Sequence, residues 1–380
     1  MTRLVLLTSH APSLVNFRTE LIKVLIAQGV DVVALAPNFD ENSRDALHLL
    51  GAKTLNCPIS RTGMNPFIDV INTLLLVRIL NKIKPDIIFS YFIKPVIYGS
   101  IAARLAGIPK IFAMVEGLGI SFTHTPNGPS FKRRLLKKIV QYLYKFGMSF
   151  ATRVIFLNPD DRADLVSLNV LPESKSFLLG GIGVPLEKWK MTPAVLEPVT
   201  FLLVARLLRE KGIEEYATAA RLVKYRYPKA RFILLGGIDD KPGSITTAMV
   251  QVWMEEGTLE WHGHVPVQPW LEQASVFVLP SYYREGVPAS TQEAIAMGRP
   301  VITTDSPGCR ETVEDGVNGF LVPTHDPQEL AKKMITFIEQ PILIDQMGRQ
   351  SRRLAEERFD AHKVNKRLAR LILTNNKTIT

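Results

Sequence analysis

The stretch YYREGVPASTQEA, residues 282–294, decides the fold because it directly follows a short apolar run at residues 276–279 and a Pro-Ser pair. An apolar run of this length that ends in turn residues predicts a buried strand of a parallel sheet. Pro288 fits the first turn of a following helix, because its missing N–H is not needed there. Glu285 is therefore expected on the strand-to-helix loop and Glu293 on the helix. In open α/β sheets, ligands bind at the carboxyl ends of strands, and a helix N-terminus offers free N–H groups to a phosphate.

Strand and helix patterns alternate on both sides of this stretch, which predicts two doubly wound α/β domains. Expected strands lie at residues 4–8, 30–36, 54–57, 86–90, 110–115 and 153–157, and then at 199–205, 231–236, 259–263, 276–279, 301–304 and 310–313, with a turn at 318–319. The predicted organisation is an N-terminal domain at 1–185, a linker at 186–198, a C-terminal domain at 199–350, and a C-terminal segment at 351–380. The linker is the end of a stretch at 180–198 that is rich in Gly and Pro. A long basic helix at 351–373 is expected to cross back onto the first domain. Neither half has Gly-x-Gly-x-x-Gly after its first strand, which argues against a dinucleotide-dependent dehydrogenase.

The composition is that of an ordinary globular protein with anionic partners. The chain has 380 residues, 46% hydrophobic and 22% charged, with a formal net charge of +10. This length favours two domains, and the charge suggests nucleic acid, phosphorylated substrates or an acidic membrane surface. The two cysteines, Cys57 and Cys309, are far apart in sequence, which favours a cytosolic protein without disulfides. The apolar run at 4–7 is too short for a signal peptide, and any membrane contact is expected to be peripheral.

Two basic residues, Arg206 and Lys211, follow the first predicted strand of the second half. Fixed cations at the carboxyl end of a strand would bind a phosphorylated ligand, and they would lower the barrier of a reaction in which negative charge develops on that ligand. The alternative is two solvated loop charges, which is the commoner state of a lone Arg or Lys. By spacing alone, Glu285 and Glu293 could likewise be two solvated surface charges. No metal site is evident, because Asp239-Asp240 lacks metal-ligand spacing.

The site stretch, together with the Gly-Arg-Pro-Val-Ile segment at 298–302, resembles the donor-site signature of family 4 retaining glycosyltransferases. This resemblance implies the GT-B fold, in which two Rossmann-like domains face a central cleft. Arg206 and Lys211 match the Arg-x4-Lys diphosphate clamp of that family. The resemblance implies catalytic roles for Arg206, Lys211 and Glu285, chemistry without a metal cofactor, and a set of donor-binding residues: Arg206, Lys211, His264, Val265, Glu285, Gly286, Val287, Ala289, Ser290 and Glu293. An exposed loop histidine remains the alternative for His264.

The first half supplies the candidate acceptor-binding residues, which follow predicted strands or belong to short motifs: Ser9, His10, Asn16, Arg18, Arg61 and Gly117. The motifs at 60–67, 115–119 and 236–242 are similar to those of bacterial N-acetylgalactosaminyltransferases of lipid-linked oligosaccharide assembly. Those enzymes use UDP-GalNAc and polyprenyl-diphosphate-linked saccharides. Glu116 stands where many family members have a His-Gly pair, and Gly183-Val184-Pro185 replaces their Asn-Gly-Val-Asp. As a catalytic residue, Glu116 has two possible roles that the sequence leaves open: a covalent nucleophile, or a group that orients a sugar hydroxyl or assists the acceptor. The resemblance favours the second role.

Residues 131–145 form a basic amphipathic segment, with Phe131, Leu135, Leu136, Ile139 and Leu143 on one expected stripe. A core-packed surface helix and a membrane-facing helix have the same pattern. Because the expected acceptor is a lipid diphosphate, the membrane-facing interpretation of this segment is favoured. Its expected partner is the anionic surface of the cell membrane, on the cytoplasmic face.

The expected activity is retaining transfer of an N-acetylhexosamine, best GalNAc from UDP-GalNAc, to an undecaprenyl-diphosphate-linked saccharide. Three alternatives remain at this point: a transferase that uses another UDP- or GDP-hexose for O-antigen or capsule synthesis, a nucleotide-sugar epimerase of GT-B shape, and a basic nucleic-acid- or membrane-binding scaffold. A nucleic-acid partner is not expected, because the basic residues are not interleaved with exposed aromatic residues.

Overall fold

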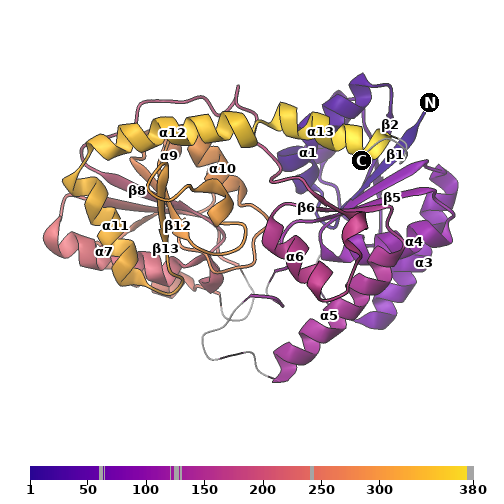
Figure 1. Ribbon diagram of the computed structural model, residues 1–380, viewed down its shortest axis with the longest axis horizontal. Helices are drawn as coiled ribbons and strands as arrows, with labels where there is room; N and C mark the ends of the chain where they lie inside the picture. Colours follow the sequence, from indigo (N-terminus) through magenta and orange to yellow (C-terminus); the bar gives the residue numbers. More distant parts are fainter. Residues whose placement is uncertain are drawn as a thin grey trace. The chain divides into compact units, whose positions relative to one another are not determined.

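The computed structural model describes residues 1–59, 63, 65–119, 121–123, 128, 131–239 and 244–374. The chain divides into two compact units (Figure 1). The first unit comprises Met1–Phe122, Asn127–Ile182 and Ala361–Thr380, and the second comprises Thr123–Pro126 and Gly183–Asp360.

The N-terminal unit is built on a seven-stranded parallel sheet with strand order β3-β2-β1-β4-β5-β6-β7. Its strands are β1 (Arg3–Leu7), β2 (Asp31–Ala36), β3 (Lys53–Asn56), β4 (Ile87–Tyr91), β5 (Lys110–Val115), β6 (Arg153–Phe156) and β7 (Ser176–Leu178). Leu4 pairs in register with Val32 on one side and Ile87 on the other. The central strands are almost completely buried, as expected when helices cover both faces of a parallel sheet.

Helices cover the two faces of this sheet according to the direction in which the chain crosses it. Right-handed crossovers place α1 (Pro12–Ala27) and α2 (Glu41–Leu49) on one face. The other face carries α3 (Pro66–Ile83), the π-helix η1 (Pro95–Gly99), α4 (Ser100–Leu105), α5 (Phe131–Ser149) and α6 (Pro159–Ser167). The last helix, α13 (Ala361–Leu373), packs against α1. Its Arg367 also donates to the Leu178 carbonyl at 2.8 Å, so the end of the chain belongs to the N-terminal unit.

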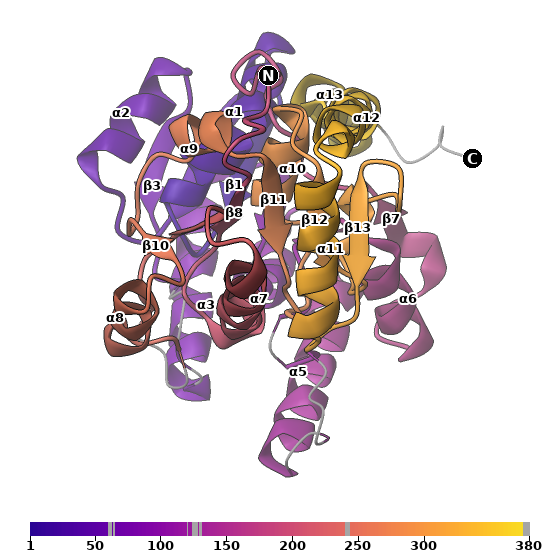
Figure 2. The ribbon, with the colours of Figure 1, turned by 90° about the vertical axis from the view of Figure 1, so that its left-hand side faces the viewer.

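The C-terminal unit has a six-stranded parallel sheet with strand order β10-β9-β8-β11-β12-β13. Its strands are β8 (Thr200–Val204), β9 (Arg231–Leu235), β10 (Glu260–Trp261), β11 (Val276–Leu279), β12 (Val301–Thr304) and β13 (Gly319–Val322). Its helices are α7 (Ile213–Arg226), α8 (Thr247–Glu255), α9 (Gln268–Gln273), α10 (Ala289–Ala296), α11 (Pro327–Glu339) and α12 (Ile342–Arg358). Figure 2 shows α7 and α11 side by side on one face of the sheet. On the other face α12 packs against α10, the helix of the site stretch.

Two predicted elements are wrong. The segment expected as a strand at 310–313 contains a 3₁₀ turn, Arg310–Thr312, and the strand begins at Gly319, where a turn is expected from the sequence. Gly319 pairs with Val301 of β12 and lies so close to it that an added Cβ would be 1.8 Å from the Val301 carbonyl oxygen. Glycine is therefore needed here for strand pairing. The single helix expected at 351–373 is the end of one helix, α12, and a second helix, α13. Between them, the Phe359 carbonyl accepts the Val184 N–H at 2.8 Å, and Asp360 forms an isolated β-bridge with Val184.

Candidate active site

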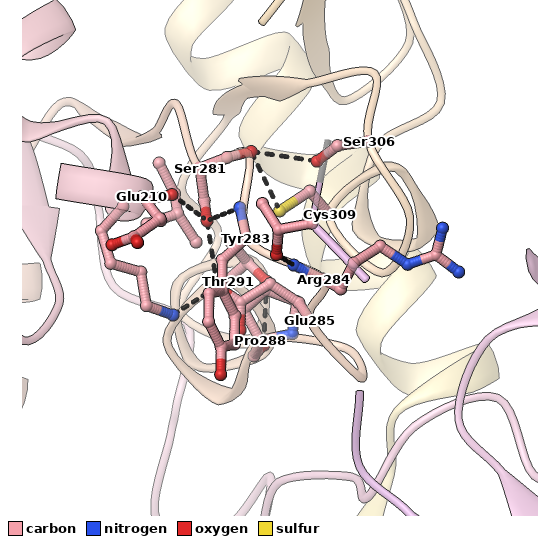
Figure 3. Close-up of polar contacts among 12 residues, drawn as sticks. Glu210, Ser281, Tyr283, Arg284, Glu285, Pro288, Thr291, Ser306 and Cys309 are labelled. Carbon is pink, nitrogen blue, oxygen red and sulfur yellow. Dashed lines mark hydrogen bonds and ion pairs between the residues drawn. The ribbon is translucent and has the colours of Figure 1, made fainter. Parts of the chain in front are cut away.

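The loop after β11 is held in place by Ser281, whose carbonyl accepts hydrogen bonds from Thr304 and Ser306, the latter at 3.0 Å (Figure 3). The same loop is joined to the loop after β8. The backbone N–H groups of Tyr282 and Tyr283 donate to the Glu210 carbonyl at 2.9 and 3.1 Å. Because β8 and β11 are adjacent strands, their carboxyl-end loops meet, and these bonds fix the meeting point.

At this point Lys211 and Glu285 form an ion pair, which brings together two of the predicted catalytic residues. Their side chains are only 13% and 11% exposed, and Glu285 also lies 3.0 Å from the Ser281 hydroxyl. The position of Lys211 is set by the backbone, since the next residue, Gly212, has φ +74°. A Cβ on Gly212 would be 2.1 Å from the Pro280 carbonyl oxygen, so only glycine allows this close approach.

A third loop supports Glu285 from the other side. Gly308, in the loop after β12, has φ +82°, and a Cβ there would be 2.5 Å from the Gly286 carbonyl oxygen. The backbone of Glu285 and Gly286 therefore lies between the loops that follow β8 and β12. Three successive strands of the sheet thus contribute to the placement of one carboxylate, which is the preorganisation that a binding or catalytic group needs.

Arg206 lies in the same loop as Lys211 but faces the neighbouring strand, β9. Its guanidinium forms a 2.9 Å ion pair with Asp239, in the loop after β9, and its side chain is 44% exposed. The two loops are also joined by a backbone hydrogen bond, in which the Leu207 N–H donates to the Gly237 carbonyl at 3.1 Å. Arg206 is therefore available at the surface of the carboxyl edge, and Asp239 is a partner that the sequence did not suggest.

His264 and Val265 follow β10, and they lie beside the loop after β9. A Cβ on Gly237 would be 3.8 Å from the Cβ of His264, and Gly236 N–H donates to the Gly263 carbonyl at 2.7 Å. His264 is exposed and Val265 is half-buried. Since β10 is three strands away from β11, these residues are roughly 14 Å from the Glu285 loop at the usual spacing of strands.

The N-terminus of α10 continues the site. Gly286 and Val287 are buried, whereas Ala289 and Ser290 are half-buried in the first turn, where N–H groups have no helical acceptor. Glu293 is half-buried one turn later, and loss of solvent raises its pKa to about 7, with the Lys188 charge acting in the opposite direction. Among the residues that the structure describes, its carboxyl has no hydrogen-bond or ion-pair partner.

In the N-terminal unit, two residues predicted for different roles form one pair: the Arg18 guanidinium is ion-paired with Glu116. Arg18 is 1% exposed, lies 4.4 Å from the centre of the Tyr91 ring and donates to the Met114 sulfur at 3.5 Å. Burial lowers the pKa of Arg18. Tyr91 is not among the predicted site residues, although it directly follows the strand predicted at 86–90, at the same carboxyl edge.

The other predicted acceptor-binding residues lie around this edge. Ser9 is buried, His10 is half-buried with its carbonyl accepting the Ser13 hydroxyl at 2.5 Å, and Asn16 is exposed on α1. Gly117 is half-buried with φ +94°. Arg61 lies outside the described residues.

Metal ligands do not gather in any part of the chain that the structure describes, since no group of three or more His, Cys, Asp or Glu side chains is close enough to hold an ion. Within the same residues, no helix is both long and apolar enough to cross a membrane.

The chain is similar to known proteins over nearly its whole length. Residues 4–158 match the family "Glycosyl transferase 4-like", and residues 198–340 match "Glycosyl transferases group 1". A relative from Campylobacter jejuni, N,N'-diacetylbacillosaminyl-diphospho-undecaprenol alpha-1,3-N-acetylgalactosaminyltransferase, is 30% identical over 87% of this chain and 88% of its own. The chain belongs to this family of glycosyltransferases.

Other members of the family and solved structures agree with this assignment. The UDP-Gal:alpha-D-GlcNAc-diphosphoundecaprenol alpha-1,3-galactosyltransferase of Escherichia coli is 26% identical over 72% of each chain. Sucrose-phosphate synthase from Thermosynechococcus elongatus superposes with a TM-score of 0.81 at 20% identity, over 98% of each chain. Anabaena HepE in complex with UDP superposes with a TM-score of 0.76 at 17% identity, over 98% of this chain and 99% of its own. The glycosyltransferase therefore has the GT-B fold, as the sequence predicts.

Proposed function

We propose that this glycosyltransferase moves an N-acetylhexosamine, GalNAc from UDP-GalNAc as the first choice, to an undecaprenyl-diphosphate-linked saccharide with retention of anomeric configuration. The product would serve the assembly of a bacterial surface glycan or N-glycan precursor. The similarity to the C. jejuni enzyme, whose name states GalNAc transfer to a diphospho-undecaprenol-linked sugar, supports both the donor and the acceptor. The E. coli relative supports the acceptor class, because its name also states a diphosphoundecaprenol acceptor.

The observation that carries the proposal is the buried Lys211–Glu285 pair at the carboxyl edge of the C-terminal sheet. An ammonium group has three donors, so Lys211 can keep its bond to Glu285 and still donate to a β-phosphate oxygen. Glu285 has further acceptor sites for hydroxyls of the transferred sugar. Arg206 is half-exposed in the same loop and would contribute a second cation to the diphosphate. Glu293 would accept hydrogen bonds from the ribose hydroxyls, and its present lack of a partner leaves both oxygens available.

In the proposed reaction, the bond between the anomeric carbon and the β-phosphate oxygen breaks, and UDP leaves with that electron pair. The acceptor hydroxyl oxygen forms the new glycosidic bond on the same face, and its proton passes to the departing β-phosphate oxygen. Lys211 and Arg206 stabilise the charge that develops on this phosphate. No step requires a metal ion, and we expect transfer to continue in the presence of EDTA.

Glu116 has a supporting role in this proposal. Its ion pair with the buried Arg18 ties the carboxylate to α1 and lowers its freedom to attack an anomeric carbon. We expect it to orient a sugar hydroxyl or the acceptor, together with the polar groups at the end of β1.

Membrane contact through α5 is part of the proposal. The structure exposes an apolar stripe on this helix that contains three of the predicted residues and two more: Phe131, Leu135, Ile139, Tyr142 and Phe146. Leu136 and Leu143 are half-buried instead, and Leu143 packs against the core. Basic residues beside the stripe, including Lys132, Arg134 and Lys138, are exposed, and α5 contains no acidic residue. An apolar stripe with a basic border is typical of helices that lie on anionic membranes. The enzyme would then work as a peripheral protein on the cytoplasmic face.

The test is mass spectrometry of the product formed from a panel of UDP- and GDP-sugars with a short-chain polyprenyl-diphosphate saccharide. We expect the acceptor to gain one N-acetylhexosamine with UDP-GalNAc, and Glu285→Gln to slow this gain by about 10²-fold in a folded protein. Efficient transfer from another sugar nucleotide, with no product from UDP-GalNAc, would overturn the donor assignment.

A further inference from the structure

Helix α3 of the N-terminal unit presents an apolar face to solvent. Phe67 is 80% exposed, Ile71 57% and Leu74 54%, and Ile68, Val70 and Leu75 are exposed as well. These six side chains lie in the first ten residues of the helix. Single exposed apolar residues are normal on protein surfaces, but a contiguous apolar patch marks an interaction site.

The opposite face of α3 is the one that packs on the sheet. Leu76 and Leu80 belong to the core of the N-terminal unit and are almost fully buried, and Asp69 and Thr73 are buried beside them. At 3.6 residues per turn, these four positions lie on the side of the helix opposite Phe67, Ile71 and Leu74. The exposed apolar side chains therefore lie outside the core of this unit.

Polar character changes along the exposed face. After the apolar first half, the exposed residues are Arg78, Asn81 and Lys82. The only acidic residue of α3 is Asp69, which is buried and forms a 2.6 Å ion pair with Lys94. The outward face of the helix is thus apolar at one end and positively charged at the other. This arrangement matches the boundary between acyl chains and anionic headgroups, where apolar side chains insert and long basic side chains reach the phosphates.

The position of α3 in the fold brings it to the same side as α5. Both helices follow strands of one parallel sheet on the same face, and both pack on the η1–α4 segment between them (Figure 1). In βα units the helices run opposite to the strands, so Phe67 and Phe131 both lie toward the carboxyl edge of the sheet. A symmetric contact of this face with a second copy of the chain would bring two strongly basic α5 helices together, and repulsion disfavours that occupant.

We infer that α3 is a membrane-insertion helix, with Phe67, Ile71 and Leu74 in the acyl boundary of an anionic bilayer and Arg78 and Lys82 at its headgroups. This deepens the proposed function, because a membrane-linked acceptor would give the contact its purpose. The insertion itself needs no substrate, so it can be tested apart from transfer. α5 would supply most of the electrostatic attraction, and α3 would add its apolar face to the apolar stripe of α5.

The first experiment is flotation of the full chain with vesicles of phosphatidylglycerol and phosphatidylethanolamine. We expect F67S/I71S/L74S to raise the lipid concentration at half-binding by about tenfold or more, because each side chain withdrawn from the bilayer loses its transfer free energy. The matched control L222S/V252S/M254S removes three similarly exposed apolar residues of the C-terminal unit and should bind as the wild type does. Wild-type binding by the α3 variant would overturn the inference.

A second measurement does not depend on a triple substitution. The native cysteines, Cys57 and Cys309, are buried, so a single Leu74→Cys can be labelled with the fluorophore bimane. We expect a blue shift on addition of the same vesicles and none for Leu222→Cys. An unchanged spectrum at Leu74, or a vesicle-independent dimer that is lost in F67S/I71S/L74S, would contradict membrane insertion. Transfer to a water-soluble acceptor should be unchanged in that variant. If the wild type fails to transfer but still binds vesicles, the proposed function fails and the insertion stands.

Discussion

Replacing Lys211 by Met separates the two roles that its ammonium group has in this account. The ion pair with Glu285 is nearly nine-tenths buried, and loss of one partner leaves the other charged and unpaired. Breaking such a pair costs about 3 kcal/mol or more of folding free energy. If Lys211 also stabilises the departing β-phosphate, the same substitution reduces turnover by about 10²-fold.

The two effects can be resolved with a double-mutant cycle. Lys211→Met/Glu285→Gln removes both charges, and we expect it to recover most of the stability lost in Lys211→Met. It should not recover turnover. Chemical denaturation gives the free energies, and UDP release in a single-turnover assay gives the rates for the wild type and the three variants.

The comparison that decides is between Glu285→Gln alone and the double variant. A phosphate-binding Lys211 predicts a further large loss of rate when Lys211→Met is added to Glu285→Gln. Equal rates for these two variants would show that Lys211 serves only as the counterion of Glu285, and would refute the clamp.

Further predictions concern other parts of the two units. The pKa of Glu293 is raised to about 7, so the folded state favours the protonated carboxyl. The stability that this protonated carboxyl provides is present at pH 4 and is lost as the pH rises through 7. Glu293→Gln should therefore raise the Tm at pH 8 and not at pH 4. We also expect UDP binding to weaken below pH 7 as Glu293 becomes protonated, and Glu293→Gln should remove this pH dependence. Glu116→Gln should slow transfer by about 10²-fold with retained configuration by NMR, and a wild-type glycosyl-enzyme adduct in intact-protein mass spectrometry would contradict this. Gly308→Ala should cost about 2 kcal/mol or more and lower activity, because its Cβ would clash with the Gly286 carbonyl. Gly257→Ala, at a similar φ with open space around it, is the matched control. Vesicle binding should weaken with falling phosphatidylglycerol content, and it should weaken strongly when Gln replaces three exposed basic residues of α5: Lys132, Arg134 and Lys138.

Much of the fold could be predicted because buried parallel strands are short apolar runs with turn residues after them. The runs at 4–8 and 276–279 correspond to β1 and β11. β13 was misplaced because its first residue is a glycine, which normally indicates a turn. The close approach to the Val301 carbonyl that requires this glycine depends on the pairing of β12 with β13, which is a tertiary feature.

The site residues could be placed on loops, but their partners could not. The order of strands in the sheet makes β8 and β11 neighbours, and only this order brings Lys211 to Glu285. In the same way, β1 and β5 both flank β4, and so Arg18 can reach Glu116 across Tyr91. Gly308 is a support that sequence reasoning missed, because its contact is with backbone atoms of a segment more than twenty residues away.

The central claim is that the loop after β8 holds the diphosphate of a UDP-sugar donor. Calorimetric titration of UDP and UMP into the wild type and Lys211→Met/Glu285→Gln tests it most directly, because the two nucleotides differ only in the β-phosphate. Charge-assisted bonds from Lys211 and Arg206 predict that the wild type binds UDP at least about tenfold more tightly than UMP. The double variant should lose most of this preference while it keeps its affinity for UMP. Equal affinities of the wild type for UDP and UMP would contradict the claim.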